Sequence, residues 1–129
     1  MKYVAVLAAS IALLGAAPVS AKDVSFSADI VPVLKKRCAI CHLTGQEAGH
    51  LALHPKAAFK NLVSHKSEES DWMLVQPKQP DKSYLVMKLE GTHLKSGGKG
   101  ARMPFAQQPL DTETVALFRA WIKAGALNN

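Results

Sequence analysis

Apolar residues recur along this chain in short segments with helical spacing, and nothing in the pattern alternates as strand, helix and strand. The clearest helix is predicted after Asp111, whose side chain can cap the first turn, and it ends at Gly125. Its apolar residues fall on one helical face: Val115, Phe118, Trp121 and Ile122. This pattern is typical of a helix that packs one face against a core.

Three shorter helices are predicted before it, from Asp29 or Val31 into Cys38, over Lys56–Val63 and over Lys82–Glu90. Pro32 falls in the first turn of the first helix, where its missing N–H does no harm. Asp81 is the expected N-cap of the third helix, and Gly91 stops it. Long loops separate the helices, among them Leu43–Leu53 and the glycine-rich Gly91–Arg102. The sequence therefore predicts an all-α fold of short helices and long loops.

The N-terminal segment does not fit this pattern, because Val4–Ala17 is an unbroken run of 14 apolar and small residues. It is shorter than the roughly 20 residues that cross a bilayer as a helix. Val19-Ser20-Ala21 follows as a small-x-small cleavage site. We therefore expect Met1–Ala21 to be a signal peptide, cleaved on export to the periplasm, with an uncleaved anchor as the alternative. Residues 22–129 would form one domain, opening with a polar lead over Lys22–Ser27 and carrying no transmembrane segment.

Charge and composition argue against a nucleic-acid-binding protein and favour one with a cofactor. The net charge of +6 favours acidic partners, but the basic residues form no dense tract of the kind that binds nucleic acid. Aromatic residues make up only 6% of a chain of 129 residues. A domain this small often needs a covalent link or a cofactor to complete its core. We expect no nucleic-acid binding and a large apolar cofactor at the centre.

The candidate chemistry lies in Cys38-Ala39-Ile40-Cys41-His42, which matches the Cys-x-x-Cys-His signature of covalent haem attachment. Cysteines three positions apart lie on one side of a helical turn, so both sulfurs can reach one porphyrin. The histidine four positions after the first cysteine falls on the same face and can bind the iron. The motif predicts one covalent haem c per chain, held by Cys38 and Cys41 and ligated by His42.

Three other interpretations of the cysteines are open. A thioredoxin-like dithiol needs a βαβ surround, which the pattern lacks. A disulfide between Cys38 and Cys41 would close a very small loop and constrain the unfolded chain little. A zinc site could use His50 and His54 with the two cysteines, but the gap between the ligand pairs is shorter than in zinc fingers.

The sixth ligand of such an iron is open among several residues. Those after His42 that could bind are Met73, Met87, Met103, His50, His54, His65 and His93. Met73 and Met87 sit among apolar neighbours and are expected in the core. Met103 stands on a loop before Pro104, which restricts its backbone. His93, in the same glycine-rich segment, is its main rival.

The chain resembles the class I cytochromes c, and within them a group of bacterial single-haem domains. The resemblance rests on the haem motif, on Arg102-Met103-Pro104, and on Trp121-Ile122-Lys123-Ala124-Gly125 in the last helix. It extends to Asp29-Ile30-Val31-Pro32-Val33-Leu34, Leu62-Val63, Pro80-Asp81-Lys82-Ser83-Tyr84-Leu85 and Lys88-Leu89-Glu90-Gly91. The segments that depart from the family pattern are Ser64–Trp72 and Gly91–Arg102.

This resemblance implies that Met103 is the second axial ligand and that the fold is the cytochrome c fold around one haem. It also implies that Ile30 and Leu34 of the first helix meet Phe118 and Trp121 of the last. With both axial positions filled, we expect a monomeric periplasmic one-electron carrier and no enzyme. The alternatives are a haem subunit of a larger oxidoreductase, or a small-ligand-binding enzyme or sensor with a labile Met103. Acidic redox partners would meet basic residues around the haem edge, for which we expect Lys95, Lys99 and Arg102.

Overall fold

The computed structural model describes Val24–Glu47 and Gly49–Asn129, so the predicted signal peptide and its cleavage site lie outside the described residues. Within these ranges the chain is mainly helical, and its only extended pairings are two isolated bridges. The all-α prediction is therefore confirmed as a fold class. None of the helices in this part of the chain is both long and apolar enough to cross a membrane.

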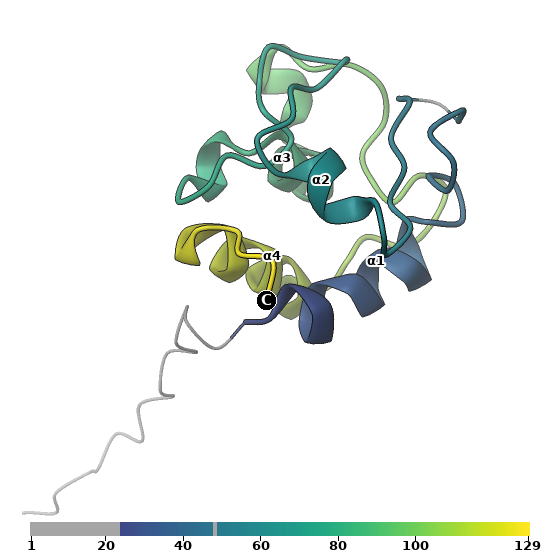
Figure 1. Ribbon diagram of the computed structural model, residues 1–129. Helices are drawn as coiled ribbons and strands as arrows, with labels where there is room; N and C mark the ends of the chain where they lie inside the picture. The colour runs from purple at the N-terminus through teal and green to yellow at the C-terminus, as the bar shows by residue number, and fades with distance from the viewer. Residues whose placement is uncertain (1–23, 48) are drawn as a thin grey trace, which may run out of the picture.

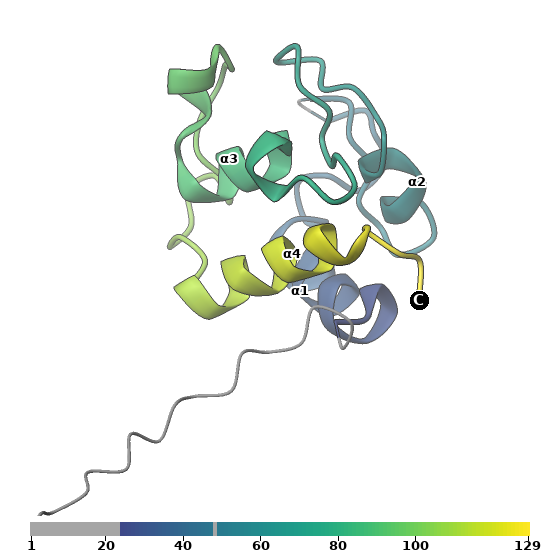
Figure 2. The same cartoon turned by 90° about the vertical axis from the view of Figure 1, so that its left-hand side faces the viewer.

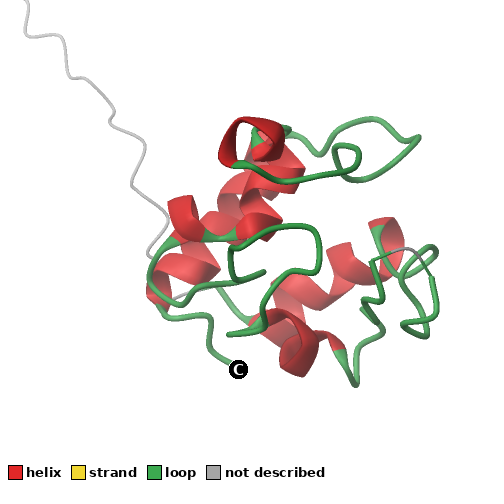
Figure 3. Ribbon diagram, turned by 90° about the horizontal axis from the view of Figure 1, so that it is seen from above, coloured by secondary structure: helices red, strands yellow, loops and turns green. Residues whose placement is uncertain are grey.

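Four α-helices and three short helical turns follow one another over the described residues. In order they are η1 (Phe26–Ile30, a π-helical turn), α1 (Val31–Arg37), α2 (Ala58–Leu62), η2 (Pro80–Lys82), α3 (Tyr84–Glu90), η3 (His93–Ser96) and α4 (Thr112–Ala124). Helices α1 and α4 make up one half of the molecule, and α2 and α3 make up the other (Figures 1 and 2). Long loops join them (Figure 3).

The first helical segment begins earlier than the sequence indicated, because η1 starts at Phe26. The Ser25 hydroxyl accepts a hydrogen bond from the Ala28 N–H at 3.1 Å, and the Asp29 carboxylate accepts one from the Ser25 N–H at 2.7 Å. This reciprocal capping satisfies two free N–H groups at the start of the helix. The polar lead predicted over Lys22–Ser27 is thus wrong at Val24 and Phe26, which are buried, and η1 begins inside it.

Helix α4 has the ends that the sequence predicted. The Asp111 side chain accepts a hydrogen bond from the Thr114 N–H at 2.7 Å, and Gly125 closes the helix in the left-handed conformation with φ of 119°. That hydrogen bond also lowers the pKa of the Asp111 carboxyl group. Both caps act through short-range chemistry, which explains why the sequence alone located them.

Helix α3 starts two residues later than predicted. Ser83, and not Asp81, occupies the N-cap position, and Asp81 lies in η2. The Asp81 carboxylate instead pairs with Arg119 of α4, which also donates to Glu90 at 2.9 Å. The Asp81 side chain, which the local sequence predicted as the N-cap of α3, therefore forms an ion pair with a distant helix instead. The predicted stop at Gly91 is confirmed, with φ of 77°.

One apolar core lies between the two halves of the molecule. Its buried members are Val24, Phe26, Ile30, Leu34, Leu53, Ala58, Leu62, Val75, Leu85, Val86, Leu89, Leu110, Phe118, Trp121, Ile122 and Ala126. Phe26 packs on Trp121 with ring centroids 5.1 Å apart and meets Phe59 edge-on at 5.3 Å. Ile30 and Leu34 belong to the same cluster as Phe118 and Trp121, as the resemblance implied.

The two methionines expected in the core differ. Met87 is buried on α3, but Met73 is 37% exposed, so its prediction is wrong. The Met73 backbone forms an antiparallel bridge with Lys66, and the Ser67 N–H donates to the Trp72 carbonyl at 2.9 Å. These bonds close a turn at the surface, where a side chain reaches solvent whatever its hydropathy.

Substitution of a core leucine tests this packing. Leu62→Ala removes a fully buried side chain and should lower the free energy of unfolding by about 2–5 kcal/mol. Leu94→Ala, at a residue that is 63% exposed, is the matched control and should lower it by less than about 0.5 kcal/mol. Denaturant unfolding of the purified proteins measures both. Equal losses in the two variants would contradict the core described above.

Candidate haem site

A cavity of about 360 Å³ opens beside the core. Its walls come from the end of α1 and the loop after it, from the turn after α2, from α3, and from the loop before α4. The lining residues are Arg37, Cys38, Cys41, His42, Gly49, His50, Leu51, Leu53, His65, Lys66, Ser67, Glu68, Glu69, Leu74, Leu85, Lys88, Leu89, Gly100, Ala101, Met103, Pro104, Phe105 and Gln107. All four site residues proposed from the sequence are among them.

The end of α1 positions the first three of these residues. Cys38 continues the helix, since its N–H donates to the Leu34 carbonyl at 2.9 Å. The Cys38 carbonyl then accepts from the N–H groups of Cys41 at 3.1 Å and His42 at 3.0 Å. The chain thus makes one more turn after α1. The side chains of both cysteines and of His42 line the cavity. The Leu53 N–H donates to the His42 carbonyl at 2.6 Å and ties the following loop to this turn.

The two thiols are free of any disulfide, and their environments differ. Burial raises the pKa of the Cys38 thiol to about 11, while the neighbouring Arg37 charge opposes that rise. Cys41 is exposed. Thiol–disulfide exchange needs a thiolate, which a lowered pKa supplies. The raised pKa of Cys38 therefore disfavours a redox-active dithiol.

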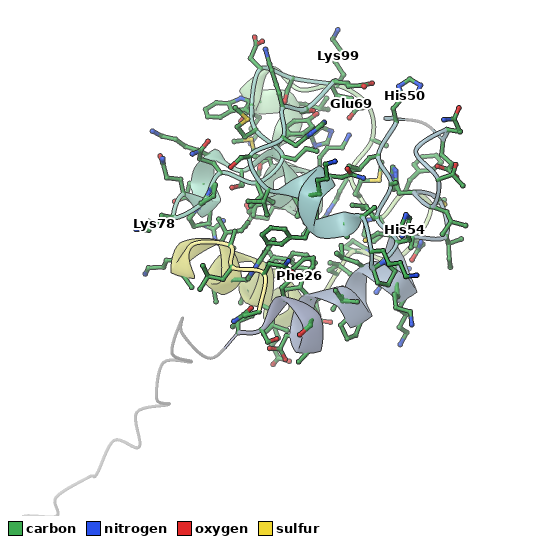
Figure 4. All side chains as sticks on the ribbon, viewed as in Figure 1. Phe26, His50, His54, Glu69, Lys78 and Lys99 are labelled. Atoms are coloured by element: carbon green, nitrogen blue, oxygen red, sulfur yellow. The ribbon has the colours of Figure 1, made fainter. Side chains whose placement is uncertain are left out.

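The zinc alternative is not assembled. No three or more His, Cys, Asp or Glu side chains in the described ranges are grouped so that they could hold a metal ion. His50 lines the cavity, but its Nδ1 lies 2.8 Å from a Glu68 carboxylate oxygen, and His54 is not a lining residue. Figure 4 shows His50 and His54 on different parts of the loop that follows α1.

His42 is suited to bind a metal through one nitrogen. Burial lowers the pKa of its imidazole, and the Glu47 and Glu69 carboxylates oppose that shift. A lowered pKa favours the neutral ring, which is the form that binds metals. Its Nδ1 is buried and has no hydrogen-bond partner. The Nδ1 of His93 is also buried without a partner, so this feature alone does not single out His42.

Met103 reaches the cavity from a segment distant in sequence. Its N–H donates to the Lys88 carbonyl at 3.0 Å, which fastens this loop to α3. The next residue, Pro104, is buried and follows a cis peptide bond. Met103 itself is half-buried against the core and lines the cavity.

His93, the main rival of Met103, is absent from the cavity lining. It is 2% exposed and meets Tyr84 edge-on with ring centroids 6.3 Å apart. Its Nε2 donates to the Gly100 carbonyl at 3.0 Å. Of the histidines after His42, His50 and His65 line the cavity, and both are exposed.

The basic residues at the cavity are not those expected from the sequence. Lys95, Lys99 and Arg102 are exposed and none lines the cavity, whereas Arg37, Lys66 and Lys88 do. Lys88 was missed altogether. It lies one turn after Tyr84 and three residues after Leu85, on the buried face of α3, and a charge on that face was the available signal.

The comparisons with known proteins add nothing to this picture. No model of a protein family matches the chain, and neither a curated protein nor a solved structure matches it. Function therefore has to be argued from the cavity itself.

Two glycines in this wall offer a test of its geometry. Gly49 and Gly100 both have left-handed φ, 80° and 72°, so an alanine costs about 1–2 kcal/mol at either. A Cβ at Gly100 would also lie 2.8 Å from the Glu69 Oε1 and 3.2 Å from the Lys88 Nζ, but at Gly49 nothing lies within 4 Å. Gly100→Ala should therefore lower the free energy of unfolding by about 1 kcal/mol more than Gly49→Ala. Equal losses in denaturant unfolding would refute the close approach of Glu69 and Lys88.

Proposed function

We propose that this protein is a single-haem c-type cytochrome that carries electrons one at a time in the periplasm. Cys38 and Cys41 would hold the haem through thioether bonds, and His42 and Met103 would bind the iron. The proposal rests chiefly on one observation. These four side chains, from two segments far apart in sequence, line the same cavity. The arrangement of short helices around that cavity would then be the cytochrome c fold.

The residues present fit such a group. The volume of about 360 Å³ is within the usual range of cofactor pockets, about 300–1,000 Å³. Much of the wall is apolar, with Leu51, Leu53, Leu74, Leu85 and Leu89 facing the space. The donor set suits iron in a haem, since it offers two thiols for attachment, an imidazole and a thioether.

Haem bound here would supply one-electron exchange between ferrous and ferric iron. The protein's part would be to bind the iron through His42 and Met103 and to keep water away. A methionine thioether favours the ferrous state and raises the reduction potential relative to a second histidine. With His42 and Met103 both engaged, no axial position would be left for a substrate, which favours a carrier over an enzyme.

A partner surface is available beside the attachment motif. Ile40 and Leu43 on either side of the Cys41-His42 pair are 75% and 50% exposed. The last turn of α1, shortly before them in sequence, carries Lys35, Lys36 and Arg37. Exposed apolar residues close in sequence to positive charges suit transient docking of an acidic redox protein, steered by the charge of the chain.

Intact mass spectrometry of protein from the periplasm tests the attachment. The expected mass is that of a chain beginning at Lys22 plus one haem, which acidified acetone does not extract because thioether bonds hold it. Cys38→Ala and Cys41→Ala should each leave one thioether bond. Free thiols at both positions in the exported protein would overturn the proposal.

Substitution of Met103 tests the sixth ligand. Met103→Ala should abolish the near-infrared ferric band that methionine ligation gives, lower the potential and let carbon monoxide bind the reduced protein. His93→Ala should keep the near-infrared band, because His93 is absent from the cavity lining and Met103 is still present to bind the iron. Retention of the band in Met103→Ala would show that another residue is the ligand.

A further inference from the structure

Buried side chains form hydrogen bonds to the backbone of Lys99 and Gly100, shortly before Met103. The Tyr84 hydroxyl accepts from the Lys99 N–H at 3.1 Å and lies 3.2 Å from the Lys99 carbonyl, to which it donates. The Lys88 Nζ donates to the same carbonyl at 2.9 Å. His93 donates from Nε2 to the Gly100 carbonyl at 3.0 Å. Three buried side chains thus bind the backbone of two consecutive residues of an exposed loop.

The loop approaches these side chains so closely that glycine is required. A Cβ on Gly98 would lie 2.5 Å from the Tyr84 ring and hydroxyl and 2.9 Å from the His93 carbonyl. The Gly98 N–H donates to that same carbonyl at 2.9 Å. The position of the loop relative to α3 is therefore fixed in two ways. Its backbone is hydrogen-bonded, and its glycine lies too close to Tyr84 and His93 for any side chain.

A buried ion pair joins a third segment to this group. The Lys88 Nζ lies 2.7 Å from the Glu69 Oε2, and their side chains are 7% and 35% exposed. Glu69 belongs to the turn after α2, and the Trp72 indole of the same turn donates to the Ser96 carbonyl at 3.0 Å. In Figure 4, Glu69 and Lys99 lie at the same end of the molecule, away from Phe26. The two segments that depart from the family pattern are thus bound to each other and to α3.

Lys88 connects this group to the cavity in two ways. Its side chain binds the Lys99 carbonyl, and its own carbonyl accepts the Met103 N–H at 3.0 Å. Both ends of the stretch from Lys99 to Met103 are therefore fastened to one residue. An apolar residue of similar size often stabilises a fold as well as a buried ion pair does. A role in positioning accounts better for the buried charge than a role in stability.

We propose that Glu69, Tyr84, Lys88 and His93 form a clamp that positions Met103 at the cavity. The proposal rests on the proposed function, because it assigns these residues to the placement of the sixth ligand. None of them binds iron in this account. They are positioning residues, and they act by limiting how far the Met103 loop can move away from α3.

Tyr84→Phe, Lys88→Met and Glu69→Gln test the clamp in the haem-containing protein. In all three variants the Lys88 carbonyl that accepts the Met103 N–H is retained. Each variant should nevertheless speed hydrogen exchange of the Met103 amide by about tenfold, which is the effect of losing one buried hydrogen bond. Each should also raise the affinity of the ferric protein for added imidazole, which competes with Met103, by about tenfold.

Lys66→Met is the matched control. Lys66 lines the same cavity and carries the same charge, but it pairs with Asp71 at the surface and does not touch the loop. It should change neither exchange nor imidazole affinity. A purely electrostatic role predicts opposite shifts of the potential in Lys88→Met and Glu69→Gln, and no effect of the uncharged change Tyr84→Phe. Native exchange and native imidazole affinity in Tyr84→Phe would overturn the clamp.

Failure of the clamp is distinguishable from failure of the proposed function. If Met103→Ala opens the iron to imidazole and the three clamp variants do not, the function stands and the clamp is wrong. If the unmodified protein carries no covalent haem, the function fails. Hydrogen exchange of the Met103 amide then still decides whether Tyr84, Lys88 and Glu69 hold the loop.

Discussion

The packing of η1 against α4 is the contact on which the rest of the molecule depends. Phe26 stacks on Trp121, and the backbone of Asn129 closes the contact by accepting the Ser27 N–H at 2.9 Å. Because η1 runs directly into α1, this contact sets the direction in which α1 leaves the core. The Cys38–His42 turn follows α1 and thereby reaches the cavity that α3 also lines. The position of the attachment motif is a consequence of a contact between the two ends of the domain.

Local chemistry decided how much of the fold could be predicted. The ends of α4 and the stop of α3 at Gly91 depend on caps and on glycine, whose effects extend over a single turn. The errors fall where a distant group takes over a side chain. Asp81 pairs with Arg119 across the molecule, and Phe26 is buried by α4. No window of sequence around either residue contains its partner.

The candidate site divides in the same way. The spacing of Cys38, Cys41 and His42 places them on one side of a helical turn. The sequence alone was therefore enough to propose them as site residues. Met103 was proposed through a family resemblance. It lines the same cavity as the motif, but it is distant in sequence, and no sequence spacing predicts that the two meet. The loop anchor at Lys88 could not be predicted, because it needs Glu69, Lys99 and Met103 to arrive from three segments. A charged residue on a buried helix face was its only trace in the sequence.

The absorption spectrum of the exported protein, recorded oxidised, reduced, and reduced under carbon monoxide, tests the central claim most directly. It reports the type of haem and the state of both axial positions in one sample. The account predicts the narrow bands of a six-coordinate, low-spin c-type haem on reduction, unchanged by carbon monoxide. A protein without haem bands would contradict the account. So would a reduced spectrum that carbon monoxide converts at once, since His42 and Met103 would then not both be bound.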